Sequence, residues 1–243
     1  MAEPAKQILI IVHQAQSTPG RVGMALRARG YELDIRRPCI GHPLPETTEP
    51  YDGVVVFGGP MSANDCGELD YIRDEISWLD VPLRENTPFF GICLGAQLLS
   101  RHLGGQVETH PDGMAEVGYY PIFPTQAGEQ MMEWPSHMYQ WHREGFSVPD
   151  TAELLVKGEM FENQAFRYGP SAIGIQFHPE LTLAMMHRWT VKGRERLTLP
   201  GTQKPDAHFD GRRKYDHQVK EWLEQFLDLW LVSKAGVQTI AAE

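Results

Sequence analysis

The residues best suited to catalysis in this sequence are a cysteine, a histidine and a glutamate from two short segments. Cys93 stands between Gly91 and Gly95, after an apolar run of strand length and before residues that favour a helix. This pattern predicts a strand–turn–helix corner with Cys93 at its apex, because only small neighbours fit where strand and helix nearly touch. The positive end of the helix dipole favours the thiolate, which is the nucleophilic form. The alternative is that Cys93 is a small buried apolar residue.

His178 and Glu180 supply a base and a group that can orient it. Side chains two apart on an extended chain point the same way, and Pro179 keeps His178 extended. Glu180 can therefore accept a hydrogen bond from one ring nitrogen of His178 while the other nitrogen faces Cys93. These are the roles of a nucleophile, base and orienter triad. Taken alone, His178 would be read as a satisfied core histidine.

Strands and helices that alternate along the chain must position these residues. Predicted strands cover 7–12, 31–36, 51–57, 88–92 and 172–177, and predicted helices cover about 20–29, 68–83 and 181–192. Continuous apolar strands without alternation are typical of parallel strands buried on both faces. The predicted fold class is α/β, a doubly wound and mostly parallel sheet with flanking helices. Ligand sites of such sheets lie at the carboxyl ends of the strands.

The remaining segments add to this sheet. Short runs punctuated by Gly and Pro at 106–110, 119–123, 153–156 and 165–168 predict antiparallel ribbons. An irregular loop is expected over 193–210, followed by an amphipathic helix over 214–232 whose aromatic face packs on its own domain. We expect a single domain over 1–243, with 193–243 as a C-terminal loop and helix extension.

The loop Gly58-Gly59-Pro60 directly follows the third predicted strand. Glycines let the backbone approach a ligand, and Pro60 stiffens the loop. We expect the backbone N–H groups of Gly59 and Leu94 to hold the oxyanion of an acyl-transfer intermediate.

Composition and charge exclude several functions. A formal net charge of −10 argues against binding to nucleic acid or an anionic membrane. Three cysteines without a CxxC pair favour a reducing cytoplasm, and we expect neither a leader peptide nor a membrane span. His137 and His142 lack the i, i+4 spacing of a helical metal site, so no metal is expected.

Three segments together resemble the signature of class I (triad-type) glutamine amidotransferases. They are the segment Gly-Ile-Cys93-Leu-Gly-Ala-Gln97, the Gly58-Gly59-Pro60 loop and the segment 176–180, Gln-Phe-His-Pro-Glu. The resemblance is greatest to the stand-alone group related to the amidotransferase domain of GMP synthase, whose W-H-x-D-x-F-x-L-P segment is similar to the stretch 139–149. The similarity covers about 53–181 and implies a flavodoxin-like sheet.

The resemblance implies that Cys93 attacks the side-chain amide of glutamine, giving a γ-glutamyl thioester and ammonia, while His178 moves the proton. It also implies that no cofactor is needed. Residues expected to contact the substrate by this resemblance are Gly58, Gln97, Glu144, Gly145 and Phe146. Arg143-Glu144 departs from the more common Gly-Asp, which affects how the substrate is recognised.

The destination of the ammonia leaves alternatives open. The chain after Glu180 is too short for an ATP-dependent domain and has no Gly-rich phosphate loop. Either a separate synthase subunit takes the ammonia, or the enzyme acts alone as a γ-glutamyl peptidase or amide hydrolase. A third alternative is a catalytically silent regulatory subunit. Expected partners are a small-molecule substrate, a synthase subunit or a second copy of the chain, with no nucleic acid and no membrane.

Overall fold

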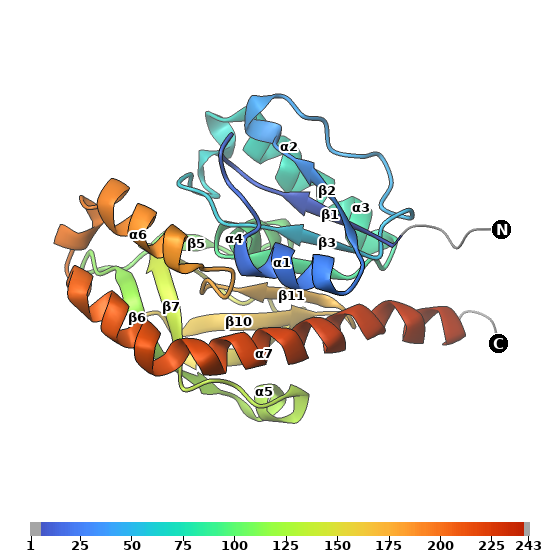
Figure 1. The fold of residues 1–243 in the computed structure, drawn as a ribbon. Coiled ribbons are helices and arrows are strands. Elements are labelled where there is room, and N and C mark those ends of the chain that lie inside the picture. The colour runs from blue at the N-terminus through green and yellow to red at the C-terminus, as the bar shows by residue number, and fades with distance from the viewer. Residues whose placement is uncertain (1–5, 241–243) are drawn as a thin grey trace.

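A large central sheet organises the chain in a computed structural model that describes residues 6–240, with side chains to residue 232. Among these residues nine strands form one sheet in the order β2-β1-β3-β4-β11-β10-β9-β6-β7 (Figure 1). Their bounds are β1 Gln7–Ile11, β2 Glu32–Arg36, β3 Gly53–Val56, β4 Phe89–Ile92, β6 Glu116–Pro124, β7 His137–His142, β9 Ala152–Gly158, β10 Asn163–Tyr168 and β11 Ala172–Ile175. A separate antiparallel pair joins β5 (Val107–Thr109) to β8 (Glu144–Phe146).

The half of the large sheet from β2 to β11 is parallel, and the half from β10 to β7 is antiparallel. The parallel strands β3, β4 and β11 are buried at every position, as their apolar runs predict. The sequence therefore correctly predicted an α/β fold with a mostly parallel sheet and a small antiparallel ribbon. Strand β7 was not predicted as a strand.

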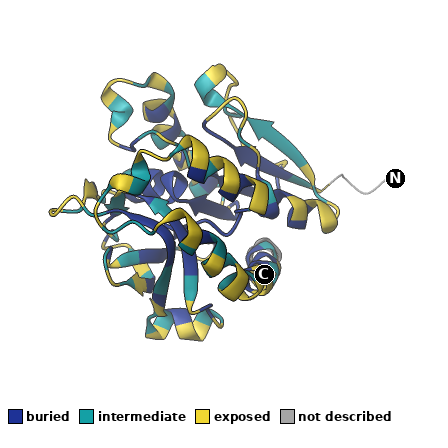
Figure 2. Cartoon of the chain, turned by 60° about the vertical axis from the view of Figure 1, so that its left-hand side comes forward, coloured by how far each residue is buried: buried dark blue, intermediate teal, exposed yellow. Residues whose placement is uncertain are grey.

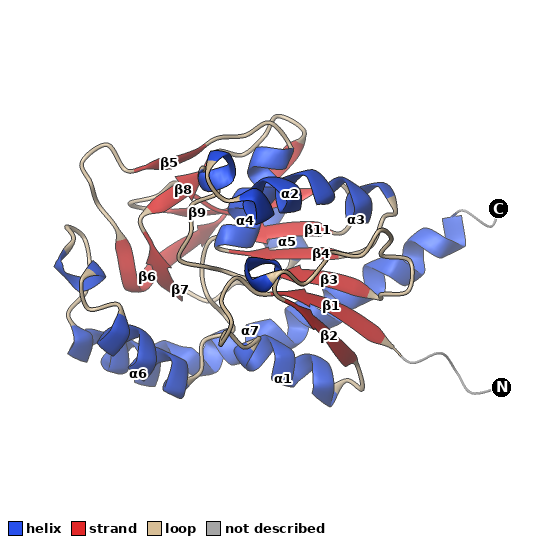
Figure 3. Ribbon diagram, turned by 90° about the horizontal axis from the view of Figure 1, so that it is seen from above, coloured by secondary structure: helices blue, strands red, loops and turns tan. Residues whose placement is uncertain are grey.

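Helices cover both faces of the parallel half (Figure 3). Helices α1 and α7 lie on one face, and α2, α3 and α4 lie on the other (Figures 1 and 3). The helix bounds are α1 Gly20–Ala28, α2 Asp70–Trp78, α3 Asp80–Arg84, α4 Leu94–His102, α5 Gln126–Met131, α6 Leu183–Lys192 and α7 Pro205–Ile240. Short 3₁₀ helices occur at Pro38–Ile40, Asp65–Gly67 and Arg196–Thr198. Each face has its own apolar core, so the central strands are buried between two helical layers (Figure 2).

Two predictions about the helices were wrong in their boundaries. The expected helix over 68–83 is divided into α2 and α3, because Pro82 has no N–H to donate to the carbonyl of Trp78. The expected loop over 193–210 is shorter, because α7 already begins at Pro205, where proline is favoured at the first helical position. Among the residues that the structure describes, no helix is both long and apolar enough to cross a membrane.

Candidate active site

Cys93 occupies the sharp turn between β4 and α4, as its neighbouring glycines predict. Its backbone has φ 52° and ψ −103°, a left-handed conformation that is strained for a residue other than glycine. The backbone N–H of Cys93 donates to the carbonyl of Ile175 at 2.8 Å, which ties the turn to β11. A Cβ atom on Gly95 would lie 2.2 Å from the carbonyl oxygen of Val56. Glycine is therefore required where α4 passes the end of β3.

His178 and Glu180 follow β11 and are both buried. The backbone N–H of His178 donates to the carbonyl of Tyr139 at 2.8 Å, and its Nδ1 lies 2.7 Å from Oε1 of Glu180. The ring of Trp189, from α6, packs edge-on against the imidazole with 5.0 Å between centroids. These contacts fix the orientation of the ring and leave its Nε2 without a hydrogen bond of ordinary geometry among the described residues.

Electrostatic interactions favour the protonated form of His178. Burial by itself would lower the pKa of the imidazole, but the negative charges of Glu180 and then of Cys93 outweigh burial and raise the pKa to about 10. Because the Nδ1–H of His178 donates to the Glu180 carboxylate, the second proton of the imidazolium is on Nε2, the nitrogen that faces the cavity. The site can therefore hold an imidazolium that gives up a proton only to a strong acceptor.

The in-register pairing of three parallel strands brings these groups together. Val56 of β3 pairs with Gly91 of β4, and Ile92 of β4 pairs with Ile175 of β11, so the three carboxyl ends lie side by side. A cavity of about 530 Å³ opens at this edge. Its lining includes Cys93, His178, Glu180, Gly58 and Gly59.

Gly58 lies close to both the nucleophile and the base. A Cβ atom on Gly58 would lie 3.0 Å from Cε1 of His178 and 3.4 Å from Cβ of Cys93. The loop after β3 therefore packs closely against both catalytic candidates. Among the described residues, neither the N–H of Gly59 nor that of Leu94 donates to a protein acceptor, and both remain available to a ligand.

Four of the residues expected to contact the substrate do not line this cavity. Gln97 is buried, and its Nε2 donates to the carbonyl of Glu144 at 3.0 Å and to Oε1 of Gln176 at 3.3 Å. The Glu144 carboxylate accepts from Oγ of Ser62 at 2.9 Å. Gly145 and Phe146 line a second cavity of about 240 Å³. The structure therefore does not place Gln97, Glu144, Gly145 or Phe146 on the wall of the cavity that contains Cys93.

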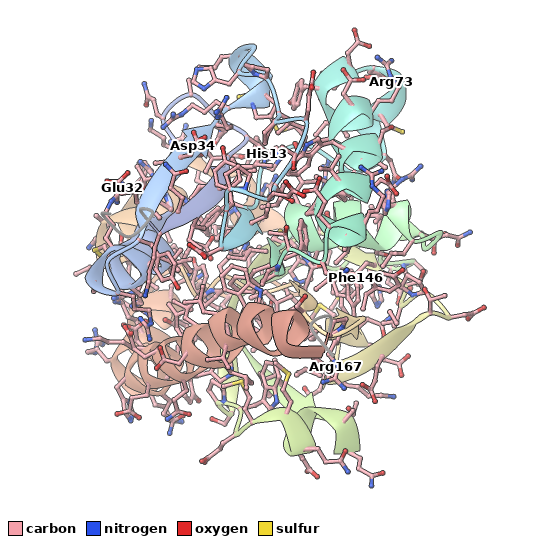
Figure 4. All side chains as sticks on the ribbon, turned by 90° about the vertical axis from the view of Figure 1, so that its right-hand side faces the viewer. His13, Glu32, Asp34, Arg73, Phe146 and Arg167 are labelled. Atoms are coloured by element: carbon pink, nitrogen blue, oxygen red, sulfur yellow. The ribbon has the colours of Figure 1, made fainter. Side chains whose placement is uncertain are left out.

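Two interactions near Cys93 were not found from the sequence. Nε2 of Gln176 donates to Sγ of Cys93 at 3.5 Å, which adds a side-chain contact to the nucleophile. Behind the Gly58-Gly59 loop, fully buried His13 contacts fully buried Glu75 and lies in the interior of the molecule (Figure 4). The position of His13 just beyond the predicted strand 7–12 could have identified it, because this strand also ends at the ligand edge of the sheet.

One face of α6 forms a wall of the cavity. This wall was not predicted from the sequence. Met185, Arg188, Trp189 and Lys192 all line the cavity, and their spacing places them on one side of a helix. Arg196 follows in the next 3₁₀ turn. Among the residues that the structure describes, no group of three or more His, Cys, Asp or Glu side chains could hold a metal ion.

The chain is similar to proteins of one known family. The family model described as glutamine amidotransferase class-I matches residues 20–191. The glutamine amidotransferase-like protein YfeJ of Salmonella typhimurium is 30% identical over 232 residues, which cover 91% of this chain and 96% of YfeJ. One of the subunits of the glutamine-hydrolysing GMP synthase of Methanopyrus kandleri is 30% identical over 155 residues, covering 57% of this chain and 74% of the relative.

Solved structures show the same fold. A glutamine amidotransferase of Thermotoga maritima superposes with a TM-score of 0.83 at 27% identity, covering 93% of this chain and 98% of the other. A glutamine amidotransferase of Methylobacillus flagellatus gives a TM-score of 0.85 at 26% identity, with 94% and 95% covered. On the family match and the long alignment with YfeJ, this chain belongs to the class-I glutamine amidotransferase family.

Proposed function

We propose that this chain hydrolyses the side-chain amide of glutamine through a γ-glutamyl thioester on Cys93. Family membership implies the hydrolysis of the glutamine amide. The observation that supports the cysteine mechanism is the strained turn that holds Cys93 beside buried His178 in one cavity. A strained nucleophile beside a fixed base is typical of acyl-transfer enzymes.

In the first half of the reaction the Cys93 thiolate attacks the amide carbon of glutamine, and a C–S bond forms. The carbonyl oxygen becomes an oxyanion, which the N–H groups of Gly59 and Leu94 are free to bind. The C–N bond then breaks as the imidazolium of His178 transfers a proton to the leaving nitrogen, and ammonia departs.

In the second half a water molecule gives a proton to neutral His178 and attacks the thioester. The C–S bond breaks, glutamate leaves, and the thiolate and imidazolium are restored. Throughout, Glu180 accepts the Nδ1–H bond of His178, which keeps Nε2 as the atom that exchanges protons with the substrate.

Replacing the nucleophile tests this mechanism. Cys93→Ser should lower the kcat for glutamine by at least about 10⁴-fold, because a serine hydroxyl is far less ionised than a thiol at neutral pH. Cys66→Ser is the matched control, since this free cysteine does not line the cavity. Glutamate release and covalent addition of diazo-oxo-norleucine, located by mass spectrometry, are the measurements. Turnover by Cys93→Ser at the rate of the unmodified protein would refute the assignment.

We further propose that a separate synthase subunit accepts the ammonia. A separate synthase is supported by the similarity to one of the subunits of a GMP synthase. Three free cysteines, Cys39, Cys66 and Cys93, support the proposed cytoplasmic location. Glutamine turnover that rises when an extract of the source cells is added would support a synthase partner, and sedimentation would test a homodimer.

A further inference from the structure

Three positively charged side chains from α6 and the turn after it line one wall of the cavity, although the protein as a whole is acidic. Arg188, Lys192 and Arg196 line the cavity and have no ion-pair partner among the described residues. One exposed carboxylate, Glu195, shares this wall, and Glu180 is already bound to His178. The wall therefore has an excess of positive charge, although the whole chain has a net charge of −10.

The position of His178 shows which part of a substrate meets this wall. A general acid must contact the leaving nitrogen, so the leaving group lies on the side of His178. The imidazole packs directly against Trp189 of α6, and Arg188 and Lys192 are on the same face of that helix. Any group attached to the leaving nitrogen would therefore extend toward these cations.

The cavity is also large enough to hold more than glutamine. A volume of about 530 Å³ is that of a site for a larger organic ligand. Trp141 and Trp189 give the same wall apolar area, with ring centroids 5.7 Å apart. Guanidinium groups beside such rings are well suited to bind carboxylates.

We propose that Arg188, Lys192 and Arg196 form a subsite for an anionic leaving group, so that the preferred substrates are γ-glutamyl amides of amines that carry a carboxylate. This rests on the proposed function, because the same Cys93 chemistry cleaves the amide bond. The thiolate displaces the amine, His178 gives it a proton, and water then releases glutamate. The products are glutamate and an amino acid in place of ammonia.

The test compares two substrates that differ in one charge. γ-Glutamylglycine carries a carboxylate on its leaving group, and γ-glutamylglycinamide is a neutral match of nearly the same size. The unmodified protein should show a kcat/KM about tenfold or more higher for the acidic substrate, as expected for one charge-assisted hydrogen bond. The double variant Arg188→Gln/Lys192→Gln should abolish this preference. The control Arg194→Gln should keep it, because exposed Arg194 does not line the cavity.

A binding measurement separates this proposal from the proposed function. Calorimetry on Cys93→Ala should give tighter binding of γ-glutamylglycine than of γ-glutamylglycinamide, and this difference should shrink at high salt. If the unmodified protein binds in this way and yet turns over no γ-glutamyl compound, that result would refute the proposed function but would still support the subsite. Equal affinity and equal kcat/KM for the two substrates would overturn the proposed subsite. The three cations would then be better explained as a contact for the acidic surface of a protein partner.

A second observation concerns the buried pair of His13 and Glu75 behind the loop. Nε2 of His13 lies 3.2 and 3.1 Å from the two carboxylate oxygens of Glu75, and its Nδ1 lies 3.4 Å from the carbonyl oxygen of Gly58. Both neighbours are acceptors, so an imidazolium satisfies both contacts at once. Burial by itself lowers the pKa of His13, but the Glu75 carboxylate and the backbone carbonyls together outweigh burial and raise it, which agrees with this protonation state.

The contact of His13 with the Gly58 carbonyl also fixes the direction of the Gly59 N–H. The carbonyl of Gly58 and the N–H of Gly59 belong to one planar peptide and point in opposite directions. By holding the Gly58 carbonyl, His13 therefore also keeps the Gly59 N–H pointing away from the His13 ring. We infer that His13 and Glu75 are positioning residues that keep the Gly59 N–H aimed for the oxyanion.

Two nearly isosteric replacements test this inference. The amide nitrogen of Asn can take the place of Nδ1 in His13→Asn, whereas His13→Leu has no donor, and both variants leave Glu75 equally without its partner. The Leu variant should lose about 10²-fold in kcat with little change in KM, as for the loss of one oxyanion donor. The Asn variant should stay within about fivefold of the unmodified protein, while both melt at similarly lowered temperatures.

A structural readout does not depend on activity. Crystal structures of the two variants should show the Gly58–Gly59 peptide unchanged in His13→Asn and rotated in His13→Leu. Equal losses of kcat in the two variants, or an unchanged peptide in both, would overturn the inference and leave the pair with a role in stability alone.

Discussion

Glu180 controls the acid–base state of the site through a single hydrogen bond. It holds Nδ1 of His178 at 2.7 Å, and its charge is the largest influence that raises the pKa of this imidazole. Without that charge the pKa of His178 would be lower, because burial opposes the protonated form. The carboxylate thus acts on the reaction through His178.

Glu180→Gln should therefore lower kcat by about 10²-fold, less than the loss expected for Cys93→Ser. The neutral amide can still accept the Nδ1–H bond but cannot stabilise an imidazolium. Nitrogen NMR of His178 is the direct measurement, because the unmodified ring should stay protonated up to about pH 10 and the ring of the variant should titrate well below that. An unchanged titration would show that Glu180 does not control the proton of His178.

The raised pKa also predicts how stability depends on pH. The folded pKa of His178 is about 10, above its ordinary value of 6.5, so its contribution is complete below about pH 6.5. This contribution decreases as pH rises and is lost near pH 10. Urea unfolding of the unmodified protein and of Glu180→Gln should therefore differ more at about pH 6 than at about pH 10. A difference that grows with pH would contradict this sign.

The chemistry of individual residues could be predicted in part. Cys93, His178 and Glu180 have local signals, since flanking glycines and a two-residue spacing are visible in the sequence. The pairing of His13 with Glu75 has no local signal, because this contact joins the end of β1 to the middle of α2. Such a pair becomes visible only when the layers of the fold are assembled.

At the scale of elements, close contact between α4 and β3 makes the turn possible. The absent side chain of Gly95 lets the first turn of α4 pass the carbonyl of Val56, at the end of β3. The same contact brings the loop at Gly58 next to Cys93. The distance between these two elements therefore sets the geometry of the nucleophile and the oxyanion donors together.

Gly95→Ala should consequently reduce both stability and activity. A methyl group 2.2 Å from a backbone carbonyl cannot be accommodated without moving the helix, which costs about 1–3 kcal/mol of unfolding free energy. Displacement of Cys93 should lower kcat by at least about tenfold. Gly67→Ala is the matched control, because a Cβ atom there meets nothing within 4 Å. Urea unfolding and glutamine turnover measure the two effects, and a fully active, fully stable Gly95→Ala protein would contradict this account.

Predictions of elements succeeded where a local pattern controls the structure. The apolar runs of β1, β3, β4 and β11 are parallel strands because both faces of each strand are covered. The wall of α6 escaped prediction for a different reason. Its pattern of apolar and charged residues is that of an ordinary surface helix, and only the tertiary structure turns Arg188 and Lys192 toward a cavity.

At the scale of the whole molecule, α7 packs against the centre of the sheet. The family model ends at residue 191, before this helix. Its aromatic face nevertheless packs on the parallel strands, with the Phe226 ring 4.6 Å from Phe90, and with Trp230 against Gly53 of β3. The structure thus confirms that this amphipathic helix packs within its own chain.

Trp230→Ala tests how far the protein depends on that helix. Trp230 is 2% exposed, and its removal leaves a cavity against β3 and β4 that should lower the unfolding free energy by about 3–5 kcal/mol. Leu229→Ala, at a residue 45% exposed, should change it by less than about 0.5 kcal/mol. Glutamine turnover of the folded Trp230→Ala protein should stay near normal, because Trp230 does not line the active-site cavity.

The same experiment tests the prediction that residues 1–243 form a single domain. If α7 and the sheet share one cooperative unit, fluorescence and circular dichroism should report one coincident unfolding transition in both proteins. The midpoint of the whole transition should then shift in Trp230→Ala, although the substitution lies in the C-terminal helix. A separate early transition of that helix, with the sheet unfolding at its original midpoint, would show instead that the C-terminal helix is a dispensable addition to an independently stable core.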